Sequence, residues 1–146
     1  LYGVNGWLPM LENSNAAPYL IAKPLGDYKK LNGLLAALQG YGYAVEVVSW
    51  LAKGETTKQF DSAVRKNKRA WLRKYYPAID LRNVHVVKHG TNKWRVSNYK
   101  GGILFDDESA NIHGWQRDTS SGRAVRIKDD TTLLDALESL IIQELE

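Results

Sequence analysis

The sequence predicts an α/β fold in which a parallel β-sheet is covered by helices on both faces. Short β-branched or apolar runs alternate along the chain with amphipathic helical patterns, an order typical of parallel sheets. The 146 residues are the size of one domain and can bury a core. The chain shows no internal repeat and no low-complexity linker, so we expect a single domain over residues 1–146.

Several segments carry the periodicity of a helix or a strand. Apolar residues recur every three or four positions in a helix, whereas a strand is a short run of β-branched or aromatic residues. In chain order we expect a weak helix over 4–12, a helix over 27–40, a strand over 43–49, a helix over 57–75, strands over 84–87 and 103–105, a helix starting after 107, a strand over 123–127 and a helix over 132–146. The segment 17–24 contains two prolines and is left unassigned.

Turn-forming and capping residues set the boundaries of these elements. Gly40 and Gly42 end the leucine-rich helix over 27–40, and Pro77 ends the helix over 57–75. The residues 50–56 are expected to form a loop, and 89–92, HGTN, a turn. Three adjacent polar residues are candidates to cap the last helix: Asp130, Thr131 and Thr132.

The composition excludes several kinds of chemistry. The chain has no cysteine, which removes disulfides, thiolate zinc sites and cysteine nucleophiles. Its histidines do not share a helix face, which argues against a zinc site. No apolar run approaches the roughly 20 residues needed to cross a bilayer, so we expect a cytoplasmic protein without a membrane partner. The net charge of +4 weakly favours an anionic partner.

The helix over 57–75 is strongly basic. Such a face is expected to be solvated, and the alternative is an electrostatic surface for phosphate-bearing substrates. Its basic residues include Arg65, Lys66, Lys68, Arg69, Arg73 and Lys74. Two of the five tryptophans, Trp71 and Trp115, are expected to pack in the core.

The most informative segment is 101–115, GGILFDDESANIHGW. Its apolar run, expected to be a strand buried on both faces, ends at two adjacent carboxylates, Asp106 and Asp107. Open α/β sheets bind ligands at the carboxyl ends of their strands. Neighbouring carboxylates repel each other unless a cation lies beside them, and their oxygens suit Mg²⁺. The alternative is a turn followed by a helix N-cap, a common role for aspartate.

Two further polar side chains are expected at the same edge of the sheet. Ser49 ends its predicted strand, and Lys93 follows the turn after the next one, with Lys88 as a competing choice. A hydroxyl can donate to a phosphoryl oxygen, an ammonium can balance the charge of a phosphate, and Mg²⁺ can bridge carboxylate and phosphate. These residues therefore suit phosphoryl transfer. Trp50 is a candidate to stack on a base or sugar of the substrate.

The order Ser49, Lys93 and Asp106-Asp107 resembles motifs II, III and IV of the haloacid dehalogenase-like (HAD) phosphohydrolase superfamily. More narrowly, the runs KPL…LLAALQGYGYAVEVVSWL, HGTNK and ILFDDESANIHGW are similar to small HAD-like proteins often carried by phages and bacteria. The resemblance covers roughly residues 2–115 and the closing helix. It implies a three-layer, Rossmann-like parallel sheet.

The resemblance also implies a role for each motif residue. Ser49 would hold the phosphoryl group, and Lys93 would neutralise nucleophile and phosphate. Asp106 and Asp107 would bind Mg²⁺, and Asn111 would steady the acidic loop.

The nucleophile motif of the family is absent from this chain. Family members attack phosphate with an aspartate at the end of a first strand, in the pattern DxDx(T/V). The only aspartate before Ser49 is Asp27, which begins a helix. The resemblance places the motif just upstream of LYGVNGWL, so we expect a chain truncated at its N-terminus, with residues 1–27 as a small cap segment. Because the first strand runs through the middle of the family's sheet, we expect a distorted sheet or a borrowed strand, with Tyr19–Ala22 as the candidate.

Two functions from different classes remain. The first is Mg²⁺-dependent hydrolysis of a phosphate monoester through an aspartyl-phosphate, on a nucleotide or a nucleic-acid end, with this chain inactive until the missing strand is restored. The second is a catalytically silent module that binds nucleic acid or a protein partner. A P-loop NTPase lacks support, since the chain has no Gly-Lys-(Ser/Thr) loop. A receiver domain has its acidic pair before the hydroxyl and the lysine, whereas here the pair comes last.

Overall fold

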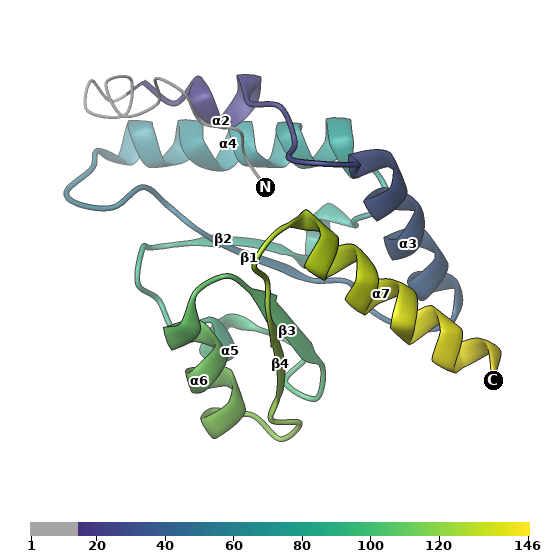
Figure 1. The fold of residues 1–146 in the computed structure, drawn as a ribbon. Helices are drawn as coiled ribbons and strands as arrows, with labels where there is room; N and C mark the ends of the chain where they lie inside the picture. Colours follow the sequence, from purple (N-terminus) through teal and green to yellow (C-terminus); the bar gives the residue numbers. More distant parts are fainter. Residues whose placement is uncertain (1–14) are drawn as a thin grey trace.

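The computed structural model describes residues 15–146 and confirms an α/β fold (Figure 1). The helices are α2 (Pro18–Ile21), α3 (Tyr28–Gly40), α4 (Lys58–Tyr75), α5 (Lys93–Val96), α6 (Ser109–Asp118) and α7 (Asp130–Leu145). The strands are β1 (Val47–Trp50), β2 (Val84–Val87), β3 (Ile103–Asp106) and β4 (Arg123–Arg126), and a 3₁₀ turn, Leu81–Asn83, precedes β2. The weak helix expected over 4–12 and the first half of the cap segment expected over 1–27 lie outside the described residues.

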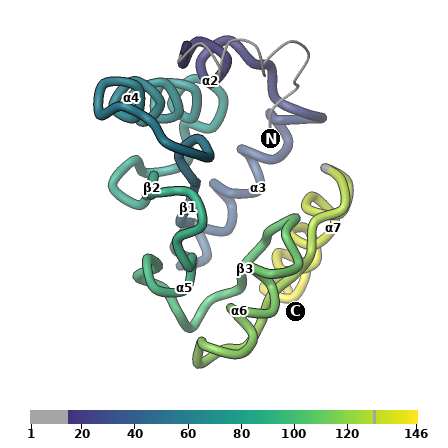
Figure 2. The backbone as a smooth tube through the Cα atoms, turned by 90° about the vertical axis from the view of Figure 1, so that its left-hand side faces the viewer, coloured from purple at the N-terminus to yellow at the C-terminus, as the bar shows by residue number. Residues whose placement is uncertain are grey.

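The strands of the described residues form two separate parallel pairs. β1 pairs with β2, with Val47 opposite Val84, and β3 pairs with β4, with Ile103 opposite Arg123. The two pairs run in different directions in Figure 1, and β1 lies between β2 and β3 in Figure 2. The parallel pairing is as predicted, but residues 15–146 do not form one continuous sheet. This interruption agrees with the expectation of a distorted sheet.

The strands differ in how deeply they are buried. The run Ile103, Leu104 and Phe105, predicted to be buried on both faces, is only half-buried, and so is all of β1. In contrast, β2 buries Val84 and Val86 almost fully. The prediction that β3 is buried on both faces was therefore wrong: β3 has one strand neighbour, β4, and its three apolar side chains stay half-buried.

The outer edge of β2 is covered by arginine side chains of α4. Arg65 Nε donates to the carbonyl of Val86 (3.2 Å), and Arg69 Nη2 donates to the carbonyl of Val84 (2.9 Å). These bonds satisfy carbonyls that would otherwise be free to accept another strand. The β1–β2 sheet therefore ends at β2.

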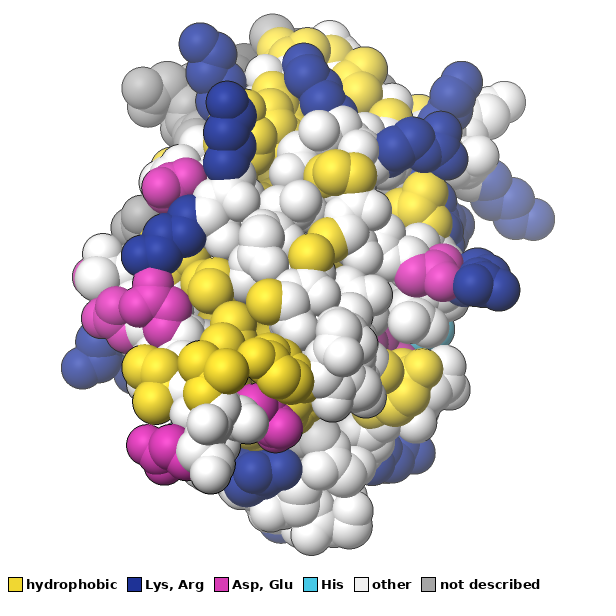
Figure 3. All heavy atoms as spheres, turned by 90° about the vertical axis from the view of Figure 1, so that its right-hand side faces the viewer, with side chains coloured by type: hydrophobic (Ala, Val, Ile, Leu, Met, Phe, Trp, Pro, Cys, Tyr) yellow, Lys and Arg dark blue, Asp and Glu magenta, His cyan; other side chains and the backbone are white. Residues whose placement is uncertain are grey.

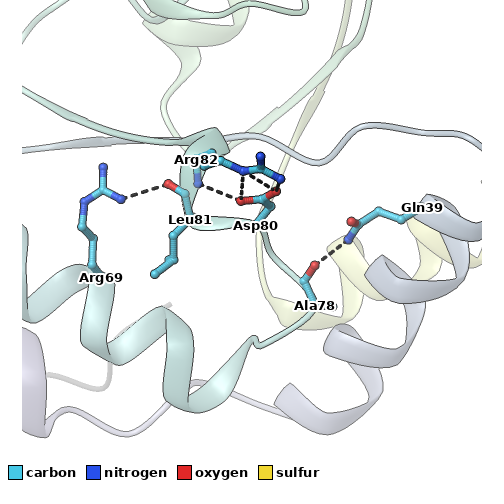
Figure 4. A network of polar contacts seen from close by, with 6 residues as sticks. All are labelled: Gln39, Arg69, Ala78, Asp80, Leu81 and Arg82. Atoms are coloured by element: carbon cyan, nitrogen blue, oxygen red, sulfur yellow. Dashed lines mark hydrogen bonds and ion pairs between the residues drawn. The ribbon is translucent and has the colours of Figure 1, made fainter.

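A network of polar contacts holds the loop that leads into β2 (Figure 4). Gln39 Nε2 of α3 donates to the carbonyl of Ala78 at 2.8 Å. Asp80 caps the 3₁₀ turn by accepting from the backbone N–H of Arg82 (2.9 Å), whose guanidinium also pairs with the Asp80 carboxylate. These contacts tie the loop before β2 to α3 and close its 3₁₀ turn.

The helix α4 forms because it combines a cap with an apolar stripe. The Thr57 hydroxyl accepts from the backbone N–H of Phe60 (3.1 Å), as an N-cap should. Phe60, Val64 and Trp71 are buried on one face of the helix, at the spacing that turns them toward the core. Trp115 is also buried, so both core tryptophans were predicted correctly.

The basic face of α4 is partly solvated. Lys66, Arg73 and Lys74 are exposed, as predicted, and Lys and Arg side chains surround the upper part of the face drawn in Figure 3, where α4 ends. Lys68 is buried instead. In the described part of the chain no helix has both the length and the apolar character needed to span a membrane.

The segment Tyr19–Ala22 does not supply a strand. Pro18 begins the short helix α2, which lies along α4 (Figure 1), and the carbonyl of Ala22 accepts from Trp71 Nε1 at 2.7 Å. A proline in the first helical turn favours the helix, because its fixed φ suits that position. The expectation of a borrowed strand here was wrong.

The helices α3 and α7 pack side by side (Figure 1). Asp27 caps α3 as predicted, accepting from the backbone N–H of Lys30 at 3.0 Å. The cap of α7 is Asp129, which accepts from the backbone N–H of Thr132 at 2.8 Å. The three predicted candidates were wrong by at least one residue, because Asp129 has the extended backbone that an N-cap needs.

Two other boundaries differ from the prediction. The strand predicted over 43–49 pairs only from Val47, because its partner β2 begins at Val84. Trp50, predicted in the loop, is the last residue of β1 and lies opposite Val87. The short helix α5 was not predicted, because its four residues directly follow a turn.

Candidate functional site

A buried ion pair joins the end of β3 to the start of α5. Lys93 Nζ lies 2.7 Å from Asp106 Oδ2, and Asp106 is only 7% exposed. The same oxygen accepts from Asn111 Nδ2 at 3.2 Å, and Asp106 Oδ1 accepts from the backbone N–H of Glu108 at 2.9 Å. Two other predicted site residues, Lys93 and Asn111, therefore both bind Asp106.

These contacts keep the Asp106 carboxylate ionised. Burial by itself would raise the pKa of Asp106. The hydrogen bond and charge of Lys93, together with the Glu108 and Asn111 donors, outweigh burial and hold this pKa below its usual range. The Asp106 carboxylate thus stays charged at neutral pH and pairs with the Lys93 ammonium.

Ser49 contacts a lysine that the sequence did not single out. Its hydroxyl oxygen accepts from Lys68 Nζ at 2.8 Å, and the same ammonium donates to the carbonyl of Trp50. Because the Ser49 oxygen accepts this bond, the Ser49 O–H group remains free to donate a hydrogen bond. Lys68 lies four residues after Val64 and three before Trp71, on the buried stripe of α4. This spacing is the signal that distinguishes Lys68 from its solvated neighbours.

Trp50 lies between the two lysines. Lys93 Nζ is 5.3 Å from the centroid of the Trp50 ring, while Lys68 binds the Trp50 backbone. The indole Nε1 donates to the carbonyl of Thr91 at 3.0 Å, and the ring packs on His89 with centroids 4.7 Å apart. Trp50 therefore connects Ser49 to the turn that carries Lys93. Stacking of its ring on a substrate stays a prediction.

The two aspartates lie in different environments. Asp106 is buried, whereas Asp107 is exposed, and the backbone carbonyl of Asp107 accepts from Arg126 Nε at 3.3 Å. Among the side chains that the structure describes, no three of His, Cys, Asp or Glu converge. Mg²⁺ is commonly held by one or two carboxylates together with waters and substrate phosphate. The two predicted ligands are not brought together, since Asp107 is exposed and Asp106 is bound to Lys93, so Mg²⁺ binding here stays a prediction.

A second polar cluster fixes the other end of α5. Ser97 Oγ donates to the Glu46 carboxylate, which also accepts from the backbone N–H of Asn98 at 3.0 Å. His85 Nε2 lies 3.0 Å from Glu46 Oε2. Glu46, half-buried before β1, thus ties α5 to both strands of the first pair. The sequence pattern gave no sign of Glu46, because its partners lie 39 to 52 residues away along the chain.

Close packing of α5 on α6 depends on Gly114. A Cβ atom at Gly114 would lie 2.2 Å from Cζ3 of Trp94, the neighbour of Lys93. We expect Gly114→Ala to lower the free energy of unfolding by about 1–3 kcal/mol through overpacking. Chemical denaturation measures this. Gly33→Ala is the matched control, because nothing lies within 4 Å of its Cβ position, and there alanine should stabilise α3 by up to about 1 kcal/mol. Equal gains at both positions would contradict the close contact.

The site as a whole collects complementary charges at the carboxyl ends of β1 and β3. It contains the Ser49 hydroxyl, the Lys68 and Lys93 ammonium groups and the ionised Asp106. Such groups can hold a tetrahedral oxyanion together with a hard cation. Comparison of the chain with known proteins finds no matching family model, no matching curated protein and no matching solved structure.

Proposed function

We propose that this chain carries the phosphate-binding and metal-binding part of a HAD-like, Mg²⁺-dependent phosphohydrolase. One observation carries the proposal: the buried Lys93–Asp106 ion pair, at the end of β3, lies close to Ser49 near the end of β1. Trp50 connects them, because it contacts both Lys68 and Lys93. This is the set of groups that the resemblance to HAD motifs II, III and IV implies. A different arrangement of the strands would have placed these side chains on different faces of the protein.

We infer that a strand between β1 and β3 completes the sheet and ends in the nucleophilic aspartate. Both strands have an unpaired edge and half-buried apolar side chains. The outer edge of β2, in contrast, is covered by Arg65 and Arg69. An inserted strand would join the two pairs in the order β2, β1, new strand, β3, β4. The result would be the three-layer, Rossmann-like sheet that the sequence predicts.

The completed site would hydrolyse a phosphate monoester in two steps. The aspartate carboxylate forms a bond to phosphorus, and the bond from phosphorus to the leaving alkoxide breaks. Water then hydrolyses the aspartyl-phosphate and releases inorganic phosphate. Ser49 donates a hydrogen bond from its hydroxyl to a phosphoryl oxygen, and Lys93 balances the negative charge of the nucleophile and the phosphate. Mg²⁺ would supply further charge neutralisation at Asp106.

The substrate we propose is a cytoplasmic nucleotide or a nucleic-acid end. The net charge of +4 and the exposed lysines and arginines of α4 favour a substrate with several negative charges.

The test is hydrolysis of an aryl phosphate with Mg²⁺ by protein expressed from the complete reading frame. We expect Asp106→Asn to lower kcat at least about 100-fold, because it removes the charge that holds Lys93 and the cation. Asp135→Asn, which changes an exposed carboxylate on α7, is the matched control and should keep wild-type activity.

The outcome also separates the two functions. A reading frame that encodes a strand ending in DxDx(T/V), with no hydrolysis in the presence of Mg²⁺, would contradict the phosphohydrolase. A protein without such a strand that binds phosphate and does not hydrolyse it would be the catalytically silent binding module.

A further inference from the structure

Lys68 is the buried cation of the described residues that lacks an acidic partner. It is 6% exposed, and it forms no ion pair with any carboxylate of the side chains that the structure describes, residues 15–129 and 131–146. Its contacts are the Ser49 hydroxyl at 2.8 Å, the carbonyl of Trp50 and the ring of Tyr19, whose centroid lies 5.0 Å from Nζ. A buried charge with neutral partners is costly unless a counter-ion joins it.

A second positive charge lies close to Lys68. Burial, and then the charge of Lys93, lower the pKa of Lys68 to about 8. Lys93 is neutralised by Asp106, so the positive charge of Lys68 remains unbalanced beside Ser49. A cation at Asp106 would make the surroundings more positive still. The positive charge around Lys68 therefore favours the binding of an anion.

The hydrogen-bonding capacity of Lys68 points to the same ligand. An ammonium group has three donors, and two of them are used by Ser49 and Trp50. One donor remains on Lys68, and the O–H of Ser49 is also free to donate. Two adjacent donors on a buried lysine and a serine suit two oxygens of one tetrahedral anion.

We propose that Lys68 is a second phosphate-binding lysine, which together with Ser49 and Lys93 holds a phosphate dianion. The dianion is either inorganic phosphate or the phosphate group of a monoester, since both present the same oxygens. This proposal rests on the proposed function and extends it by a residue outside its three motifs. Lys68 acts in binding, through its remaining donor and its uncompensated charge.

The experiment measures binding of inorganic phosphate and of phenyl phosphate to the intact chain by isothermal titration calorimetry. We expect Lys68→Met to weaken the binding of both about 10- to 100-fold, as loss of a charged hydrogen bond should. Lys66→Met removes an exposed lysine from the same helix and should bind like the wild type. Circular dichroism checks that each variant is folded.

A second measurement does not depend on a variant that folds. In wild-type protein labelled with ¹³C at lysine Cε, added phosphate should shift the Lys68 resonance and leave that of Lys66 unchanged. A wild-type protein that binds no phosphate, a Lys68 signal that does not respond, or a folded Lys68→Met variant with undiminished binding would each overturn the proposal.

The two proposals fail separately. If phosphate binding depends on Lys68 but the protein hydrolyses no aryl phosphate, the proposal for Lys68 stands and the proposed phosphohydrolase activity is refuted. If the protein hydrolyses aryl phosphate but Lys68→Met does not weaken phosphate binding, the phosphohydrolase proposal stands and the proposal for Lys68 is refuted.

Discussion

Replacing Trp71 by alanine is expected to lower the free energy of unfolding by about 3–5 kcal/mol. Trp71 is 1% exposed, and its ring packs against Tyr75 and Tyr76 with centroids 5.2 and 5.6 Å away. The substitution removes this packing and leaves a cavity in the core. It also removes the donor to the carbonyl of Ala22, so α2 loses a bond that holds it on α4.

Urea denaturation followed by circular dichroism measures this loss. Trp71→Phe keeps most of the ring but not the hydrogen bond, so it should cost less than Trp71→Ala. Tyr99→Ala, which removes an aromatic side chain that is 42% exposed, should change stability by no more than about 0.5 kcal/mol. A loss below about 1 kcal/mol for Trp71→Ala would show that this ring does not organise the core.

Replacing Lys93 by methionine is expected to destabilise the protein by about 3–5 kcal/mol at pH 7, because it leaves the buried Asp106 carboxylate without its counter-charge. The hydrogen bonds from Glu108 and Asn111 remain. They do not replace a full positive charge, so burial should then raise the pKa of Asp106 above its ordinary value.

The effect of Lys93→Met should depend on pH. In the wild type the pKa of Asp106 is lowered, so its contribution to stability is present above the unfolded pKa of about 3.9 and is lost as the pH falls through the lower folded pKa. In the variant the folded pKa is raised, so the cost at neutral pH diminishes on acidification. The difference between the two proteins should therefore be largest near pH 7 and shrink toward pH 4.

Urea denaturation at a series of pH values tests this expectation. Lys88→Met is the matched control, because Lys88 is exposed after β2 and was the competing choice for the site lysine. It should change stability by no more than about 0.5 kcal/mol at any pH. Equal losses for the two lysines, or a loss for Lys93→Met that does not vary with pH, would refute a stabilising ion pair.

Elements defined by local pattern were predicted well. The strand over 84–87 has the predicted bounds, and the helix over 57–75 begins one residue later, after its Thr57 cap. These elements depend on caps, turn residues and side-chain periodicity, all of which lie within a few residues of one another. The cap of α7 was misplaced because neighbouring residues of similar capping propensity, including Asp129 and Asp130, compete there.

Part of the site could also be predicted. Ser49, Lys93 and Asp106 were chosen because each follows or ends a predicted strand, and parallel strands bring their carboxyl ends to one edge. Asp107 was paired with Asp106 on the same grounds, but one is exposed and the other buried. Successive residues at a strand end point in opposite directions, so adjacency in sequence did not imply a shared environment.

The sequence by itself determined the α/β class, the parallel direction of the strands and the residue types at their ends, because these follow from local periodicity and from the order of elements. Only the tertiary structure decided that the strands separate into two pairs, that Lys68 is buried beside Ser49 and that Lys93, not Lys88, meets Asp106. Pairing, burial and ion pairs join residues that are far apart in the chain. Their outcome depends on which surfaces the packed helices and strands bring together, and no short stretch of sequence contains that information.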